Sequence, residues 1–243
     1  MTSRKDDVSL RQAAKTAGFG LLAMMPPAIF TNFFVLQGLV VTGDAGKTAA
    51  NIMANELLFR LGIGCLIIVI ILDVVVAWGL WVFLRPVSKS VSLLAAWFRL
   101  LYTAVFAVAL LYLAIPLRFL SGAEYLSALG TEPIYAQALL SLDSFTDGWA
   151  IGYACFFGLH LFLLGYLVLK SEYVPRLLGV LLIISSLAYV IDNSARLIIP
   201  GYEDYQAITS MVVFLPAFIG EFAFMLWLLF RGGKTTPKDA DSA

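Results

Sequence analysis

Long apolar runs alternate with short polar stretches along the chain. A helix needs roughly 20 mostly apolar residues to cross about 30 Å of hydrocarbon. Runs of that length predict six transmembrane helices, at residues 18–41, 61–84, 92–115, 149–169, 176–199 and 208–230. Unbroken runs differ from the alternating pattern of outer-membrane barrel strands. We therefore predict an all-α, polytopic transmembrane bundle within residues 18–231, between a cytoplasmic segment 1–17 and a disordered cytoplasmic tail 232–243.

Composition supports a membrane protein. Of 243 residues, 61% are hydrophobic and 13% are charged, and the mean hydropathy is +0.91, far more apolar than a soluble domain. The formal net charge is zero and no basic stripe is interleaved with aromatic residues, so we expect no nucleic-acid partner. The first run is longer than the apolar region of a signal peptide, so we interpret it as a span although basic residues precede it.

Basic residues are unequally distributed between the two ends of the predicted spans. One end carries eleven: Arg4, Lys5, Arg11, Lys15, Arg85, Lys89, Lys170, Arg176, Arg231, Lys234 and Lys238. The other carries Lys47, Arg60, Arg118 and Arg196. Because cytoplasmic loops are enriched in Lys and Arg, we expect both termini in the cytoplasm and the chain in a bacterial inner membrane. The longest outer segment, about 118–147, has apolar residues at helical spacing after Pro133 and predicts an amphipathic connector on the outer surface.

Several segments match a known family. They include Val40 to Arg60 (VVTGDAGKTAANIMANELLFR), Arg85-Pro86-Val87, Phe156-Phe157-Gly158-Leu159-His160-Leu161, Val174-Pro175-Arg176-Leu177-Leu178-Gly179 and Gly220-Glu221. In these the chain resembles a bacterial family of integral membrane proteins catalogued as domain of unknown function 4386, from roughly Ala17 to Gly232. The resemblance implies a membrane protein and brings no established activity, ligand or catalytic residue.

Four ionisable residues lie near the middle of four predicted spans: Asp73, Arg99, His160 and Glu221. Each is roughly ten residues from the predicted cytoplasmic end, which at about 1.5 Å per residue places it close to the bilayer midplane. Charges at that depth are costly unless they face the protein interior and find partners, so they are candidates for a ligand or proton site. Arg99 shares a helical face with Ser92, Ala95, Ala96, Tyr102 and Thr103, a small and polar stripe that predicts an inward orientation.

Structural interpretations compete with this one. Arg99 could form an ion pair with Asp73 or Glu221 that only fixes helix packing, and a single histidine is often a hydrogen-bonded core residue. A second polar cluster lies nearer the outer face and comprises Asn32, Asp192, Asn193 and Arg196. Asp192 and Arg196 are four residues apart, which predicts a local salt bridge.

Several kinds of chemistry lack their residues. One histidine and two cysteines inside spans do not make a zinc or haem site, so we expect no metal and no cofactor. No nucleophile elbow or phosphate-binding glycine loop is present, and we assign no catalytic residue. Three hypotheses remain: a small transporter or ligand sensor that binds a small polar ligand or a proton at the midplane, a non-catalytic membrane subunit or scaffold, and an intramembrane acid–base enzyme. We favour the first, with membrane lipids as the other partner.

Overall fold

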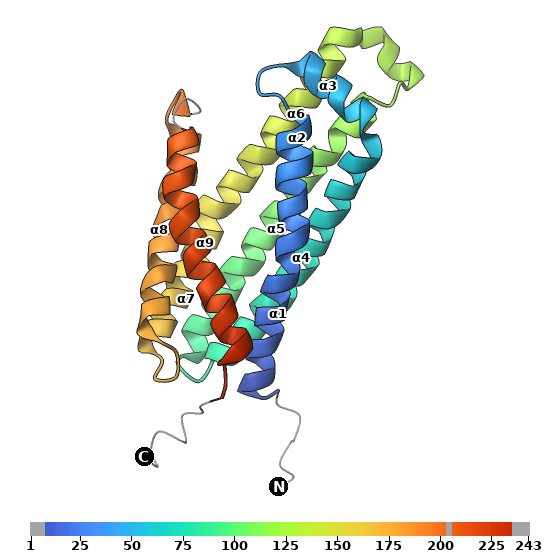
Figure 1. The fold of residues 1–243 in the computed structure, drawn as a ribbon. Helices are drawn as coiled ribbons and strands as arrows, with labels where there is room; N and C mark the ends of the chain where they lie inside the picture. The colour runs from blue at the N-terminus through green and yellow to red at the C-terminus, as the bar shows by residue number, and fades with distance from the viewer. Residues whose placement is uncertain (1–7, 203–205, 235–243) are drawn as a thin grey trace. The chain divides into compact units, whose positions relative to one another are not determined.

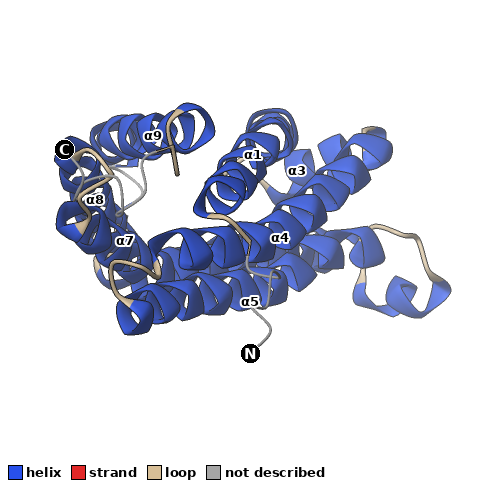
Figure 2. Cartoon of the chain, turned by 90° about the horizontal axis from the view of Figure 1, so that it is seen from below, coloured by secondary structure: helices blue, strands red, loops and turns tan. Residues whose placement is uncertain are grey.

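The computed structural model describes residues 8–202 and 206–234, the side chains of 206–217 excepted, and the described chain is helical without strands (Figures 1 and 2). The elements are α1 (Leu10–Ile29), the π-helix η1 (Phe30–Leu36), α2 (Gln37–Leu39), α3 (Ala45–Ala54), α4 (Glu56–Leu84), α5 (Lys89–Phe119), the 3₁₀ helix η2 (Glu124–Leu129), α6 (Thr131–Gly152), the π-helix η3 (Tyr153–Phe157), α7 (Gly158–Lys170), α8 (Arg176–Ile198) and α9 (Gln206–Phe230). The all-helical class predicted above is therefore confirmed.

Five helical stretches of the described residues are long and apolar enough to cross a membrane: Leu10–Leu39, Glu56–Leu84, Lys89–Phe119, Thr131–Lys170 and Arg176–Ile198. The sixth predicted span coincides with α9, of which the apolar part Phe218–Phe230 is fully described. Six spans and two cytoplasmic termini stay predictions, and most of the predicted tail lies outside the described residues.

Helix boundaries differ from the predicted ones at several places. The first helix begins at Leu10 and α4 begins at Glu56, both earlier than predicted. The largest difference concerns residues 118–147, where we predicted a separate surface connector. There α5 continues to Phe119 and α6 begins at Thr131, then runs through η3 into α7 as a helix of 40 residues.

The chain divides into two compact units. Unit 1 comprises residues 1–22, 72–102 and 151–243, and unit 2 comprises residues 23–71 and 103–150. In unit 2, the hydroxyl of Thr31 in η1 donates to the carbonyl oxygen of Gly62 in α4, 3.1 Å away. Phe106 and Trp149 stack with ring centroids 5.1 Å apart, which joins α5 to α6. Each unit thus has its own packed interior.

In unit 1, α7, α8 and α9 lie side by side (Figures 1 and 2). The α7–α8 contact depends on two facing glycines, because a Cβ on Gly165 would lie 2.8 Å from the carbonyl oxygen of Gly179 and a Cβ on Gly179 2.9 Å from that of Gly165. A Cβ on Gly220 of α9 would likewise lie 2.7 Å from Oγ of Ser185 in α8. Small residues at helix contacts are typical of membrane proteins, where packing drives association. This close approach brings the neighbouring residue Glu221 towards α8.

Arg11 fixes the first helix to the last one. Its Nη1 donates to the carbonyl oxygen of Gly232 at 2.7 Å, and its Nη2 donates to that of Leu229 at 2.9 Å. The last carbonyl groups of a helix have no partner within the helix, so a guanidinium there satisfies them and interacts well with the helix dipole. Arg11 therefore caps α9 from α1.

Candidate functional site

Three of the four predicted site residues form one hydrogen-bonded relay inside unit 1. Nη2 of Arg99 on α5 lies 2.5 Å from Oδ1 of Asp73 on α4, and the two side chains are 3% and 1% exposed. Nη1 of Arg99 lies 3.2 Å from Nε2 of His160 on α7. The predicted inward face of α5 is confirmed, since every residue of the stripe is buried. The relay therefore links three helices through groups that are out of contact with solvent and lipid.

The geometry determines the protonation of His160. A guanidinium has donors only, so Nε2 must accept the hydrogen bond from Arg99. Nδ1 lies 2.8 Å from the carbonyl oxygen of Ala95, which accepts, so Nδ1 carries the proton. His160 is consequently a neutral imidazole with both nitrogens bonded, which matches the core-histidine interpretation.

An aromatic cluster surrounds the relay, and none of its rings is among the predicted site residues. The ring of Phe157 in η3 lies 5.5 Å from Cζ of Arg99, within cation–π range. Tyr102 and Tyr189 pack on Phe157 with centroid distances of 4.9 and 5.6 Å, and Tyr153 packs on Tyr189 at 4.9 Å. Three phenols inside predicted spans were a signal that the sequence carried, because buried tyrosine hydroxyls usually bond to a polar partner.

Glu221 lies at the edge of this cluster and has a different kind of partner. Its carboxylate is hydrogen-bonded to the hydroxyl of Tyr189, and it senses the charges of Arg99 and Asp73 at longer range. The residue as a whole is partly exposed, whereas Asp73 and Arg99 are buried, but the carboxyl group of Glu221 is itself enclosed by the protein. The single arginine of this layer thus bonds directly to Asp73, and a neutral phenol holds the second acid.

The cavity that touches His160 is small. It measures about 10 Å³ and is also lined by Trp81 and Ser92. That volume corresponds to about one water molecule. This cavity therefore cannot hold a metabolite.

The second predicted cluster has a hydrogen-bonding partner that the sequence did not indicate. The hydroxyl of Tyr202 donates to Oδ1 of Asp192 at 2.5 Å, and the salt bridge between Asp192 and Arg196 stays a prediction. Nδ2 of Asn193 donates to the backbone oxygen of Tyr189 at 2.9 Å, one turn earlier in α8. The residues that follow α8 bring this phenol to the acid. Asn32 belongs to unit 2, whereas the other three residues belong to unit 1.

Among the residues that the structure describes, no three His, Cys, Asp or Glu side chains lie close enough together to bind a metal ion. Cys65 and Cys155 are free thiols. The relay and Glu221 can therefore hold and exchange protons and form hydrogen bonds, which is the chemistry that their own groups provide.

A family model described as "Domain of unknown function (DUF4386)" matches residues 16–232. The chain belongs to this family. A relative, an uncharacterised protein of Archaeoglobus fulgidus, is 36% identical over 167 residues, which cover 69% of this chain and 81% of the relative. No solved structure matches the chain. The archaeal relative supports the family assignment and leaves the predicted bacterial origin without support.

Proposed function

We propose that this DUF4386 protein is a small membrane transporter or ligand sensor in which Glu221 exchanges a proton as a small polar ligand binds. The chain would span a cytoplasmic membrane with both termini inside. The observation that supports this role is how the charged groups of this layer are paired. Asp73 and Arg99 compensate each other and His160 is neutral, so Glu221 is the acid of this layer for which the described residues show no ion pair.

Tyr189 suits this role because a hydroxyl both donates and accepts. It can donate to the Glu221 carboxylate and, after a rotation of its O–H bond, accept from the carboxylic acid. Glu221 can therefore change protonation state without losing its hydrogen-bonding partner.

A second candidate function is a scaffold in which all four groups only lock the helices together. The small cavity at His160 and the satisfied imidazole favour this candidate. The buried pair between Asp73 and Arg99 is compatible with both, because such pairs can give packing specificity as well as support a site.

Glu221→Gln separates the two candidates. In the proton-exchange role, glutamine mimics the protonated acid and still accepts from Tyr189, so the fold should tolerate it. In the scaffold role, loss of the charge should destabilise the protein by about 3–5 kcal/mol, which thermal unfolding in detergent would detect.

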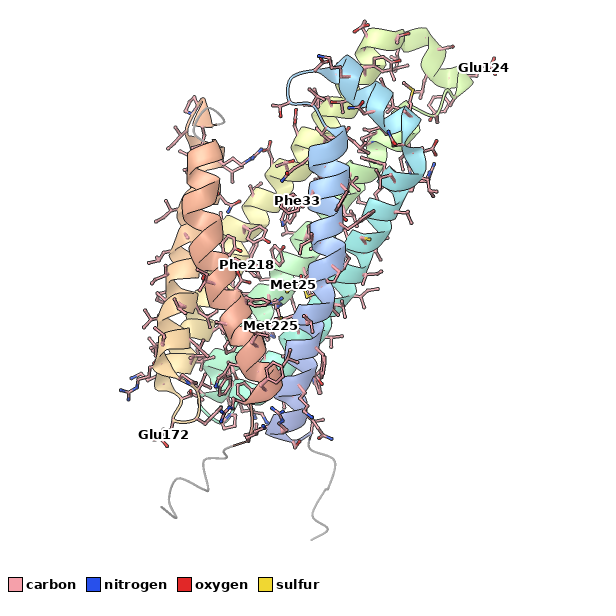
Figure 3. The ribbon with its side chains drawn as sticks, in the orientation of Figure 1. Met25, Phe33, Glu124, Glu172, Phe218 and Met225 are labelled. Carbon is pink, nitrogen blue, oxygen red and sulfur yellow. The ribbon has the colours of Figure 1, made fainter. Side chains whose placement is uncertain are left out.

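The proton itself can be followed by infrared difference spectroscopy. We expect a pH-dependent carboxylic-acid band in the wild type that Glu221→Gln lacks. Glu124→Gln is the matched control, since Glu124 is an exposed acid in η2 (Figure 3), and it should keep the band. Cells with Glu221→Gln should show the same metabolite changes as cells lacking the protein. A variant that unfolds early and keeps the band would support the scaffold instead.

A further inference from the structure

Two neighbouring pockets open at the helix ends of unit 1. One, of about 570 Å³, lies between the loop that follows α7 and the end of α9, and its polar and aromatic lining comprises Glu172, Tyr173, Trp227, Arg231 and Lys234. The other, of about 390 Å³, shares Glu172 and Tyr173 and extends to Lys170. Ligand sites commonly measure about 300–1,000 Å³, so the larger pocket has room for a small polar group.

The larger pocket has groups of both charges that are available to a ligand. Within the described chain, the side chains of Glu172, Arg231 and Lys234 form no ion pair with one another or with other residues. Arg231 and Lys234 follow α9, and Glu172 lies in the loop after α7 (Figure 3). A ligand that carries a negative and a positive group would complement this arrangement better than a simple anion.

The aromatic side of the pocket is fixed by Phe83. The hydroxyl of Tyr173 donates to the backbone oxygen of Phe83 at 2.9 Å, and the two rings meet edge to face at 5.4 Å. The ring of Trp227 lies 6.0 Å from that of Phe83. Burial raises the pKa of the Tyr173 phenol, which therefore stays neutral. Trp227 thus presents a rigid indole beside the charged residues.

The position of the pocket indicates a lipid. It lies where the apolar helices α7 and α9 end, the level at which headgroups meet a transmembrane helix, and tryptophan is enriched there. Phe230, the last residue of α9, precedes Arg231 and is 65% exposed, so an apolar surface continues from the pocket along the helix. A soluble ligand would gain nothing from that surface, whereas an acyl chain would.

We propose that this pocket binds the headgroup of a phospholipid with a phosphate and a primary ammonium group. Arg231 and Lys234 bind the phosphate, for which a guanidinium offers two parallel donors. The carboxylate of Glu172 accepts from the ammonium group, and the indole of Trp227 adds a cation–π contact. The site is independent of Glu221, so its failure would leave the proton-exchange proposal untouched.

Native mass spectrometry of the full chain, released from nanodiscs of defined composition, tests this assignment. The nanodiscs contain equal amounts of phosphatidylethanolamine, phosphatidylglycerol and phosphatidylcholine. We expect the wild type to retain phosphatidylethanolamine about tenfold over phosphatidylcholine, which corresponds to about 1.4 kcal/mol. Arg231→Gln should lose retention of all three lipids, because the phosphate contact is common to them. Glu172→Gln should keep phosphate binding and lose the preference for the ammonium headgroup.

Arg176→Gln is the matched control, because it removes the same charge from an exposed position at the start of α8 that does not line the pocket. It should retain lipid like the wild type. Equal retention of the three lipids by the wild type, or an equal loss in Arg176→Gln and Arg231→Gln, would overturn the proposal. Displacement of the lipid by soluble phosphoethanolamine or by inorganic phosphate at equal concentration would assign the pocket to a soluble phosphate compound instead.

Discussion

The buried pair between Asp73 and Arg99 allows a quantitative test of what holds unit 1 together. Asp73→Asn keeps the shape of the side chain and one acceptor for Nη2 of Arg99, but removes the countercharge. At the observed 2.5 Å and an effective dielectric constant of about 20, the attraction amounts to about 7 kcal/mol. Desolvation of the two charges offsets part of that, and breaking such a pair costs about 3–5 kcal/mol.

Thermal unfolding in detergent, followed by circular dichroism, should show this loss as a clearly lower midpoint for Asp73→Asn. The double variant Asp73→Leu/Arg99→Leu is the decisive companion. Replacing both charges by apolar groups leaves no uncompensated charge, so it should be far more stable than either single change. Strict additivity of the two single changes, or a wild-type midpoint for Asp73→Asn, would refute the reasoning that the pair is desolvated and mutually compensated.

Two further changes test the helix contacts of unit 1. Arg11→Gln removes the cap of α9, so the amides of the last turn around Leu229 should exchange hydrogen faster and the protein should lose about 1 kcal/mol, whereas Lys15→Gln on the same helix should leave both unchanged. Gly165→Ala places a Cβ within 2.8 Å of the facing backbone and should cost about 1–3 kcal/mol by overpacking. At Gly64 a Cβ would have no atom within 4 Å, so Gly64→Ala should instead stabilise α4 by up to about 1 kcal/mol through helix propensity. A higher thermal unfolding midpoint for Gly165→Ala than for Gly64→Ala would contradict the close contact of α7 and α8.

The membrane class and the inward face of α5 could be predicted from sequence because each depends on one local quantity. Apolar length decides whether a helix can span a bilayer, and helical spacing decides which residues share a face. The choice between Asp73 and Glu221 as the partner of Arg99 could not be predicted. It depends on the rotation of α4 and α9 about their axes, which tertiary packing sets through contacts such as that of Gly220 with α8.

The continuous helix from Thr131 to Lys170 was missed for a physical reason. Polar residues between 131 and 147 interrupt the apolar run and suggested the end of a span. A helix, however, is held by backbone hydrogen bonds and does not require apolar side chains. Three polar side chains of this segment are accommodated because their hydroxyl groups donate to carbonyl oxygens of the same helix one turn earlier. These are Ser141, Ser144 and Thr146. Hydropathy indicates whether a segment favours an apolar environment, so it is a weak guide to the residue at which a helix begins.

Arg11 shows a similar limit. As a basic residue before the first span it counted only towards orientation, yet the structure uses its guanidinium to cap a helix more than 200 residues later. The π-helices η1 and η3 were not predicted either. Pro26 and Pro27 lack the backbone N–H that an α-helix would use. The hydroxyl of Thr31 donates a hydrogen bond to the carbonyl oxygen of Pro27, 3.0 Å away. The geometry downstream of two prolines depends on such side-chain bonds, which spacing alone does not reveal.

Under the proposed function, the charges of the relay single out Glu221 as the residue to test. Asp73 and Arg99 cancel and His160 is neutral, so the net charge of this layer follows the protonation of Glu221 alone. A charge inside the bilayer costs about 2.5–3.5 kcal/mol by insertion scales, which is enough to couple one proton to a ligand or to a change in conformation. In a scaffold, Asp73→Asn and Glu221→Gln would each remove one of the interactions that hold the helices together, and both would destabilise the protein to a similar degree. In a proton-exchanging protein the two would diverge, with Asp73→Asn lowering stability and Glu221→Gln leaving the fold intact but insensitive to pH. The ratio of these two effects therefore separates the functions without knowledge of the ligand.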